Sequence, residues 1–224
     1  MKTEEFIFNN RKATVIIPDN FNGRWIWKAE FFKAFDKAEE DLLKIGFARV
    51  YYEVSDMYGN DKAVRLMHAF HLHLISEYGF NKKTILFGFS RGGLYAFNYT
   101  LFYPEYVEKV YLDAPVIDLR TWPPYGIFEK YEMLKELNLS ETTLLNYSEN
   151  PINKIEEYFK LGVPTLLVAG EKDTVVPYFR NAYQIIKYCE QNNIPLTYYT
   201  KPECNHHPHS LSDTKPIIDF ITAK

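Results

Sequence analysis

This chain has few cysteines and no long apolar run, and both shortages limit where it can work. Only Cys189 and Cys204 occur among its 224 residues, whereas a protein held together by disulfides needs several pairs. No segment approaches the roughly 20 consecutive apolar residues that span a bilayer. Residues 1–6 include two glutamates instead of the apolar core of a signal peptide. We therefore expect a cytoplasmic protein with reduced thiols and no membrane association.

An excess of either charge is also lacking. Lysine and arginine contribute 26 residues, and aspartate and glutamate 29, which gives a formal net charge of -3. A broad basic surface for nucleic acid is not expected at this balance. We therefore expect the chain to act on a small molecule and to bind no nucleic acid, and the composition leaves its oligomeric state open.

Apolar residues, in contrast, are plentiful. They make up 46% of the chain, and aromatic residues 17%, which is enough for one sizeable core in a protein of 224 residues. We predict a single domain over residues 1–224. Strand-like and helix-like segments alternate, which is typical of an α/β fold with a mostly parallel central sheet and helices on both faces. Residues 116–153 are too long for a tight turn, so they are predicted to form a small cap-like insertion.

Several elements can be placed from their residue patterns. Apolar side chains recur at helical spacing over residues 61–78, and Gly79 then supplies a stop. We also expect a helix over residues 29–44, preceded by a loop over residues 19–27. Strands are predicted over residues 5–8, 13–18, 47–52, 84–87, 107–112, 163–170 and 194–200.

The most informative motif is Gly-Phe-Ser-Arg-Gly-Gly at residues 88–93. It follows the predicted strand over residues 84–87 and precedes a helix-like segment, so Ser90 lies at a sharp strand-to-helix turn. A G-x-S-x-G turn in this setting exposes the serine hydroxyl above the sheet. Gly88 and Gly92 fit because a side chain at either position would collide with neighbouring elements. The motif predicts that Ser90 is a nucleophile, against the alternative of an ordinary helix N-cap.

An acid and a base follow this serine along the chain. Asp173 comes after the predicted strand over residues 163–170, in a loop from which a carboxylate can orient an imidazole. His206 follows the predicted strand over residues 194–200. A serine hydroxyl is a weak nucleophile at neutral pH, so a histidine must take its proton as it attacks a carbonyl. Ser90, His206 and Asp173 can fill the roles of nucleophile, base and acid.

This order of serine, acid and histidine resembles that of the α/β-hydrolase superfamily. The resemblance extends from the predicted strand near Ala13 to the C-terminal helix. It implies a serine hydrolase with a Ser90, Asp173 and His206 triad and with no cofactor. It also implies that the backbone N–H of Arg91, directly after the nucleophile, donates a hydrogen bond to the oxyanion of the tetrahedral intermediate.

Other residues compete for two of these roles. Asp113 also follows a strand, at a position that some members of the superfamily use for the acid, but the residues around Asp173 match the family pattern better. His207 and His209 are alternatives to His206 as the base. A metal site in this histidine cluster is not predicted, because no carboxylate or cysteine at ligand spacing completes it apart from Cys204, and a serine nucleophile needs no metal.

Aromatic residues and one histidine are candidates for the remaining contacts. The second oxyanion donor usually comes from the loop after an early strand, here residues 19–27, which lacks the usual His-Gly pair. Trp25 is the candidate for this donor. Trp27, Trp122 and His207 are candidates for substrate-binding residues, and core packing is the alternative for the tryptophans.

The predicted activity is hydrolysis of small carboxylic esters through an acyl-serine intermediate. Aromatic side chains that can stack on a ring favour acylated sugars or similar polar alcohols as substrates. A peptidase or thioesterase on the same triad is the alternative among enzymes, although peptidases of the oligopeptidase type normally carry a large additional domain. The alternative from another class is a non-catalytic hydrolase-like binding protein, which would be expected to lack the serine or the histidine.

Overall fold

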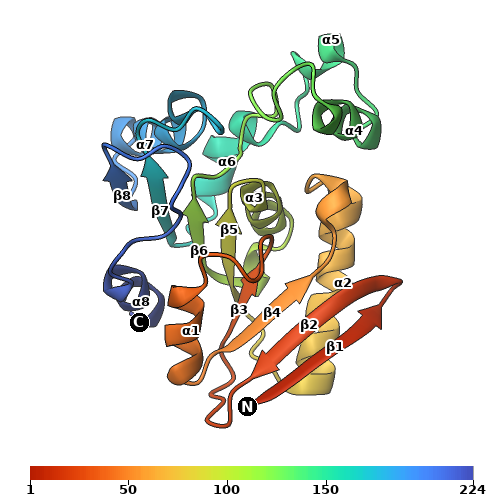
Figure 1. Ribbon diagram of the computed structural model, residues 1–224, viewed down its shortest axis with the longest axis vertical. Coiled ribbons are helices and arrows are strands. Elements are labelled where there is room, and N and C mark those ends of the chain that lie inside the picture. The colour runs from red at the N-terminus through yellow and green to blue at the C-terminus, as the bar shows by residue number, and fades with distance from the viewer. Residues whose placement is uncertain (224) are drawn as a thin grey trace.

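The computed structural model describes residues 1–223 and is organised around one eight-stranded sheet (Figure 1). The strands lie in the order β1-β2-β4-β3-β5-β6-β7-β8, and only the β1–β2 and β2–β4 pairs are antiparallel. The strands are β1 (Lys2–Phe8), β2 (Arg11–Ile17), β3 (Trp25–Lys28), β4 (Ala48–Tyr52), β5 (Thr84–Phe89), β6 (Val107–Asp113), β7 (Thr165–Gly170) and β8 (Thr197–Lys201). The predicted α/β-hydrolase fold with a mostly parallel sheet is confirmed.

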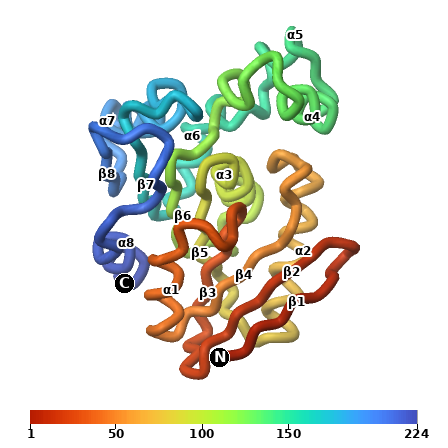
Figure 2. Tube along the Cα trace, viewed as in Figure 1, coloured from red at the N-terminus to blue at the C-terminus, as the bar shows by residue number. Residues whose placement is uncertain are grey.

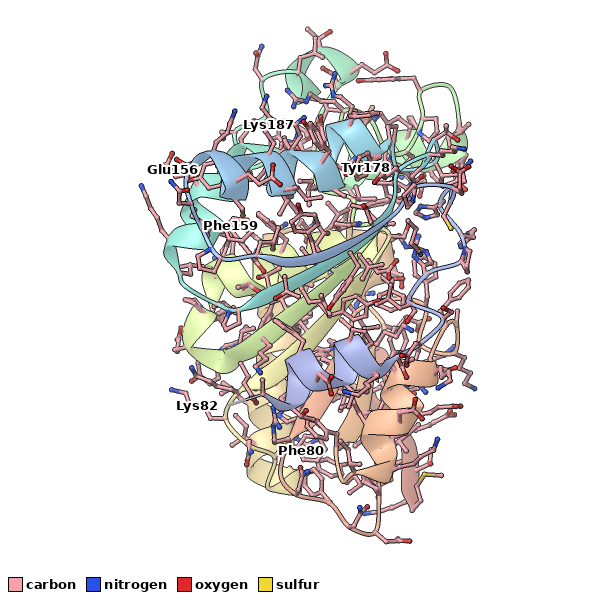
Figure 3. The ribbon with its side chains drawn as sticks, turned by 90° about the vertical axis from the view of Figure 1, so that its left-hand side faces the viewer. Phe80, Lys82, Glu156, Phe159, Tyr178 and Lys187 are labelled. Atoms are coloured by element: carbon pink, nitrogen blue, oxygen red, sulfur yellow. The ribbon has the colours of Figure 1, made fainter. Side chains whose placement is uncertain are left out.

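Helices cover both faces of this sheet, and the alternation along β5 shows why. Phe87 and Phe89 pack with side chains of α1 and α8, whereas Leu86, the residue before Phe87, packs with α2 and α3. In Figure 3, α7, which carries the labelled Lys187, and α8 lie on opposite sides of the sheet. The helices are α1 (Lys37–Lys44), α2 (Asp61–Tyr78), α3 (Gly92–Phe102), α4 (Phe128–Glu136), α5 (Glu141–Leu144), α6 (Ile155–Lys160), α7 (Ala182–Gln191) and α8 (Lys215–Thr222).

Helix α2 has the bounds that its sequence pattern predicts. The side chain of Asn60 accepts a hydrogen bond from the backbone N–H of Ala63, which caps the first turn. Gly79 ends the helix in a left-handed conformation with φ of 67°. Within residues 1–223, no helix is both long enough and apolar enough to cross a bilayer.

The region before α1 differs from the prediction. The predicted loop over residues 19–27 ends in strand β3, which pairs with β4 and β5 at the centre of the sheet. The predicted helix over residues 29–44 is only α1, because Phe31 and Phe35 adopt left-handed φ values of 57° and 53° that a helix does not admit. Strand β3 has four residues, too few for a clear periodic pattern.

The chain leaves the sheet after β6 and returns at β7 through a long segment that includes α4, α5 and α6 (Figure 2). Two buried polar groups fix its course. The carboxylate of Asp118 accepts hydrogen bonds from Arg120 and Asn150, and Nζ of Lys130 donates to the carbonyl oxygen of Leu119 at 2.7 Å. The role of residues 116–153 as a cap and the description of the chain as one domain remain predictions.

Candidate active site

Ser90 lies in a strained turn between β5 and α3. Its φ is 50°, a left-handed value that is costly for a residue with a side chain. The turn is held in place because the N–H of Ser90 donates to the carbonyl oxygen of Asp113 at 2.9 Å. A Cβ added at Gly88 would lie 2.8 Å from Cβ of Ala96, so glycine is required where the turn meets the next helix.

Glycine is also required on the other side of the turn. A Cβ at Gly93 would lie 2.6 Å from Cβ of Pro115, and a Cβ at Gly92 would lie 3.2 Å from Cβ of Glu30. Gly92 was expected to have this role from the motif, and Gly93 is packed still more tightly. The elbow is therefore fixed by backbone contacts on several sides, which holds the hydroxyl of Ser90 at the carboxyl end of β5.

His206 connects Ser90 to Asp173. Its Nε2 lies 2.9 Å from Oγ of Ser90, and its Nδ1 lies 2.7 Å from Oδ2 of Asp173. Oδ1 of Asp173 accepts the backbone N–H groups of Val175 and Val176, both at 2.9 Å. The three residues are 6 to 7% exposed, so these hydrogen bonds are shielded from water. With Nδ1–H donated to the carboxylate, Nε2 is free to accept a proton from Ser90.

Asn205 was not identified from the sequence, yet it joins the two loops that carry Asp173 and His206. Its side-chain oxygen accepts the N–H of His206 at 2.7 Å and the N–H of Thr174 at 3.0 Å. The loops also touch at Gly170, where a Cβ would lie 2.2 Å from the carbonyl oxygen of Asn205. An asparagine directly before a candidate histidine is the only signal in the sequence, and it does not reveal the partner loop.

A second histidine–aspartate pair lies beside the first. Nδ1 of His209 is 2.7 Å from Oδ1 of Asp113, and the ring centroids of His209 and His206 are 4.8 Å apart. Oδ2 of Asp113 accepts the N–H of Ser210 at 2.7 Å and the hydroxyl of Tyr111 at 2.6 Å. Within residues 1–223, no hydrogen bond connects either side chain of this pair to Oγ of Ser90.

His207 lies at the outer edge of this group. It is exposed, and its ring stacks on Phe35 with a centroid distance of 5.4 Å and an interplanar angle of 13°. Partial burial, and then the neighbouring His209 and His206, lower the pKa of His207. A neutral, exposed imidazole beside the site is suited to contact a substrate, and that role remains a prediction.

The structure overturns the assignments of Trp25 and Trp27. Trp25 is fully buried at the amino end of β3, and its Nε1 donates to the carbonyl oxygen of Asn81. Because Ile26 is level with Ile85, Trp25 lies about 20 Å from the far end of β5, where Ser90 is found.

Trp27 is also excluded from the surface that a substrate could reach. Its ring is 0% exposed and packs against Phe70 and Tyr99 in the core. Trp122, in contrast, is half-buried within residues 116–153 and packs against the edge of the core. Its contact with substrate remains a prediction, whereas core packing is the role of both Trp25 and Trp27.

The segment that approaches the elbow is the one after β3, beginning at Ala29. The carboxylate of Glu30 is 2% exposed and forms an ion pair with Arg91 at 3.2 Å. Burial raises the pKa of Glu30, although the charge of Arg91 opposes the shift. The guanidinium of Arg91 lies 5.5 Å from the ring centroid of Phe31. Strand β3 thus occupies the end of the predicted loop over residues 19–27, and the loop that reaches the elbow follows this strand.

A pocket of about 610 Å³ opens on this side of the elbow. Glu30, Phe31, Phe32 and Arg91 line it together with residues of β1 and β2. Tyr51, which stacks on Phe32 at a centroid distance of 5.4 Å, forms part of the floor. The pocket therefore combines apolar and charged lining residues and meets the elbow at Arg91, but Ser90, His206 and Asp173 do not line it.

Comparison with known proteins gives a family match over most of the chain. The model described as the prolyl oligopeptidase family matches residues 51–223. No curated protein sequence matches this chain.

Solved structures with the same fold are distant in sequence. A proposed dipeptidyl aminopeptidase IV from Bacteroides ovatus is 14% identical with a TM-score of 0.70, and the match covers 99% of this chain and 34% of that one. This chain therefore spans about a third of that protein. A carboxylesterase from Lactobacillus plantarum is 16% identical with a TM-score of 0.66, with 92% of this chain and 85% of that one covered. An S-formylglutathione hydrolase from Staphylococcus aureus is 13% identical with a TM-score of 0.69, with 98% and 94% covered.

Proposed function

This chain belongs to the prolyl oligopeptidase family, within the α/β-hydrolase superfamily, and we propose that Ser90, His206 and Asp173 are its catalytic triad. The observation that carries this proposal is the continuous path of hydrogen bonds from Asp173 through His206 to Oγ of Ser90, with distances of 2.7 and 2.9 Å. The path lies at the carboxyl edge of the parallel strands, in buried surroundings. Both observations support a serine hydrolase.

The proposed reaction gives each residue of the triad a defined role. Oγ of Ser90 attacks the substrate carbonyl while Nε2 of His206 takes its proton, and Asp173 holds the imidazole in the required tautomer. His206 then gives the proton to the leaving alcohol, and the acyl group stays on Ser90. A water molecule, deprotonated by His206, attacks this ester, and the proton returns to Ser90 as the acid leaves.

The oxyanion needs two fixed donors, and we assign them to the elbow and to the loop after β3. The backbone N–H of Arg91 follows the nucleophile directly, as this type of turn requires. The second donor proposed is the backbone N–H of Phe31. Phe31 lies beside the Arg91 side chain, and its left-handed φ of 57° turns the backbone away from a helical path. This assignment replaces that of Trp25.

The proposed substrates are small carboxylic esters. The pocket of about 610 Å³ beside Arg91 has room for a short acyl group or a small alcohol. Burial of Trp25 and Trp27 removes two of the aromatic side chains that favoured a sugar, so we propose polar alcohols without restricting them to sugars. The second candidate is hydrolysis of peptides, which the match to the prolyl oligopeptidase family favours.

The test compares ester and amide substrates on one enzyme preparation. We expect turnover of p-nitrophenyl acetate and much slower turnover of aminoacyl p-nitroanilides. Faster turnover of the anilides would assign the chain to the peptidases of its family. A fluorophosphonate should add to Ser90, which mass spectrometry of the digested protein would locate. Absence of both turnover and labelling would contradict the triad and favour a binding protein.

A further inference from the structure

Three imidazoles converge at the mouth of the site. His206, His207 and His209 can each offer a ring nitrogen, and these nitrogens all lie within 4.8 Å of one another. The ring centroids are 4.8 to 4.9 Å apart in all three pairs. Two rings are buried and that of His207 is exposed, so the group is open to solvent on one side.

Buried carboxylates orient two of these rings by hydrogen bonds, as they do for histidine ligands of metals. Nδ1 of His206 is 2.7 Å from Asp173, and Nδ1 of His209 is 2.7 Å from Asp113. A carboxylate that accepts Nδ1–H fixes the tautomer whose lone pair is on Nε2 and makes that nitrogen more basic. Histidine ligands of zinc are commonly oriented in this way. Both aspartates were candidates for the acid of one triad in the sequence, but that each orients its own histidine was not predicted.

The spacing is close to that of a three-histidine zinc site. Zn–N bonds of about 2.0–2.1 Å place the nitrogens of a tetrahedral site about 3.3 Å apart. The three nitrogens, which all lie within 4.8 Å of one another, therefore need to approach by up to roughly 1.5 Å. The exposed ring of His207 can move toward the two buried rings, because its stacking partner Phe35 is itself 40% exposed. Water would fill the fourth position.

We propose that His206, His207 and His209 form a reversible Zn²⁺ site, and that Zn²⁺ bound there blocks the active site. Imidazole nitrogen suits zinc among the common divalent cations. Coordination of Nε2 of His206 replaces its hydrogen bond to Ser90, so this nitrogen can no longer accept the serine proton. No electron transfer is involved: three nitrogen–zinc bonds form, and metal-bound water and the Ser90 hydrogen bond are displaced. The blocking effect rests on the proposed function, whereas binding of the ion does not.

Binding is tested directly on the Ser90→Ala variant, in which catalysis plays no part. Chelator-treated Ser90→Ala protein is titrated with ZnCl₂ in a calorimeter, and one bound ion per chain is expected. Adding His207→Ala or His209→Ala should weaken binding at least about tenfold, and adding Asp113→Asn should weaken it by about 10 to 100-fold through His209. Cys204→Ser is the matched control, because this thiol is a zinc-type ligand outside the cluster, and it should change nothing.

Two results would overturn the site. One is the absence of Zn²⁺ binding by Ser90→Ala, and the other is equal affinity in Ser90→Ala with and without the histidine substitutions. Loss of binding on adding Cys204→Ser would likewise contradict the proposed site, because it would place the ion at the thiol of Cys204.

Inhibition is tested on the chain with Ser90 intact. Hydrolysis of p-nitrophenyl acetate should fall as ZnCl₂ is added and return with EDTA. Each variant is compared with its own metal-free rate, and His207→Ala should need at least about tenfold more Zn²⁺ for half-inhibition. Hydrolysis that persists at saturating Zn²⁺ would overturn the blocking effect. Zn²⁺ binding in a protein without any hydrolysis would instead contradict the proposed function and leave the metal site standing.

Discussion

His206 and His209 come from one loop, and each places Nδ1 2.7 Å from a buried aspartate, yet only His206 reaches Ser90. The two aspartates explain the difference. Asp113 ends β6 on the same face as Tyr111, which packs with α1 and α8, and it therefore draws His209 toward that face. Asp173 lies in the loop beyond β7 and holds His206 above the strand ends. A buried acid orients a histidine, but the position of that acid decides whether the histidine meets the nucleophile.

Removal of the nucleophile or of its base should have the largest effect on the rate of hydrolysis. Ser90→Ala should lower the rate of p-nitrophenyl acetate hydrolysis by roughly 10⁴-fold or more, and His206→Ala should approach the same rate. The double variant should lose little beyond either single variant, because triad members act as a unit. Additive losses in steady-state kinetics would contradict a shared role.

Exchanging each aspartate for asparagine distinguishes the roles of the two histidine–aspartate pairs. Asp173→Asn should reduce kcat by about 10³ to 10⁴-fold, because it favours the wrong tautomer of His206. Asp113→Asn should cost well under about a hundredfold, since its partner does not contact Ser90. If Asp113→Asn proved the more damaging variant in the same assay, the acid would have to be reassigned to β6.

Removal of His209 should affect stability more than chemistry. His209→Ala leaves Asp113 buried with one hydrogen bond fewer, so the free energy of unfolding should fall by about 1 to 3 kcal/mol. Turnover should fall by well under about a hundredfold, much less than the loss for His206→Ala. Urea denaturation measures the first quantity, and an unchanged midpoint would show that Asp113 is satisfied without His209.

The smallest effect is expected from Tyr111→Phe, which removes only the hydroxyl that donates to Asp113 at 2.6 Å. Asp113 keeps the N–H of Ser210 and His209, so the free energy of unfolding should fall by about 1 kcal/mol. Hydrolysis should stay close to that of the parent chain. A large loss of activity would mean that the pair of His209 and Asp113 influences catalysis by His206 and Asp173. The hydrogen bonds do not indicate such an influence.

The elbow could be predicted from sequence because its requirements are local. An apolar strand, a serine between glycines and a following helix are contiguous, so Ser90 needed no tertiary information. The pattern of residues 61–78 likewise gave helix α2. Strand β3 was missed because its four residues lie between Arg24 and a segment with left-handed residues.

The sequence pattern predicts that Asp173 orients His206, but the pairing of His209 with Asp113 could not be predicted, because it depends on which loops meet in space. His206 and His209 are three positions apart, and the residues around His209 do not show that it meets Asp113. Those contacts follow from the order of β6 and β7 in the sheet. Trp25 and Trp27 were misassigned for the same reason, since burial in a central strand is a property of the assembled sheet.

The side chain of Asn205 joins the loop that carries Asp173 to the loop that carries His206. Its oxygen accepts an N–H from each loop, at 3.0 and 2.7 Å, and the backbones touch at Gly170. Ser90 contacts these joined loops through the hydrogen bond between its Oγ and Nε2 of His206, at 2.9 Å. Local opening should therefore move acid and base away together, still bonded to each other. The hydrogen bond between Ser90 and His206 is therefore the contact within the triad that such an opening would break.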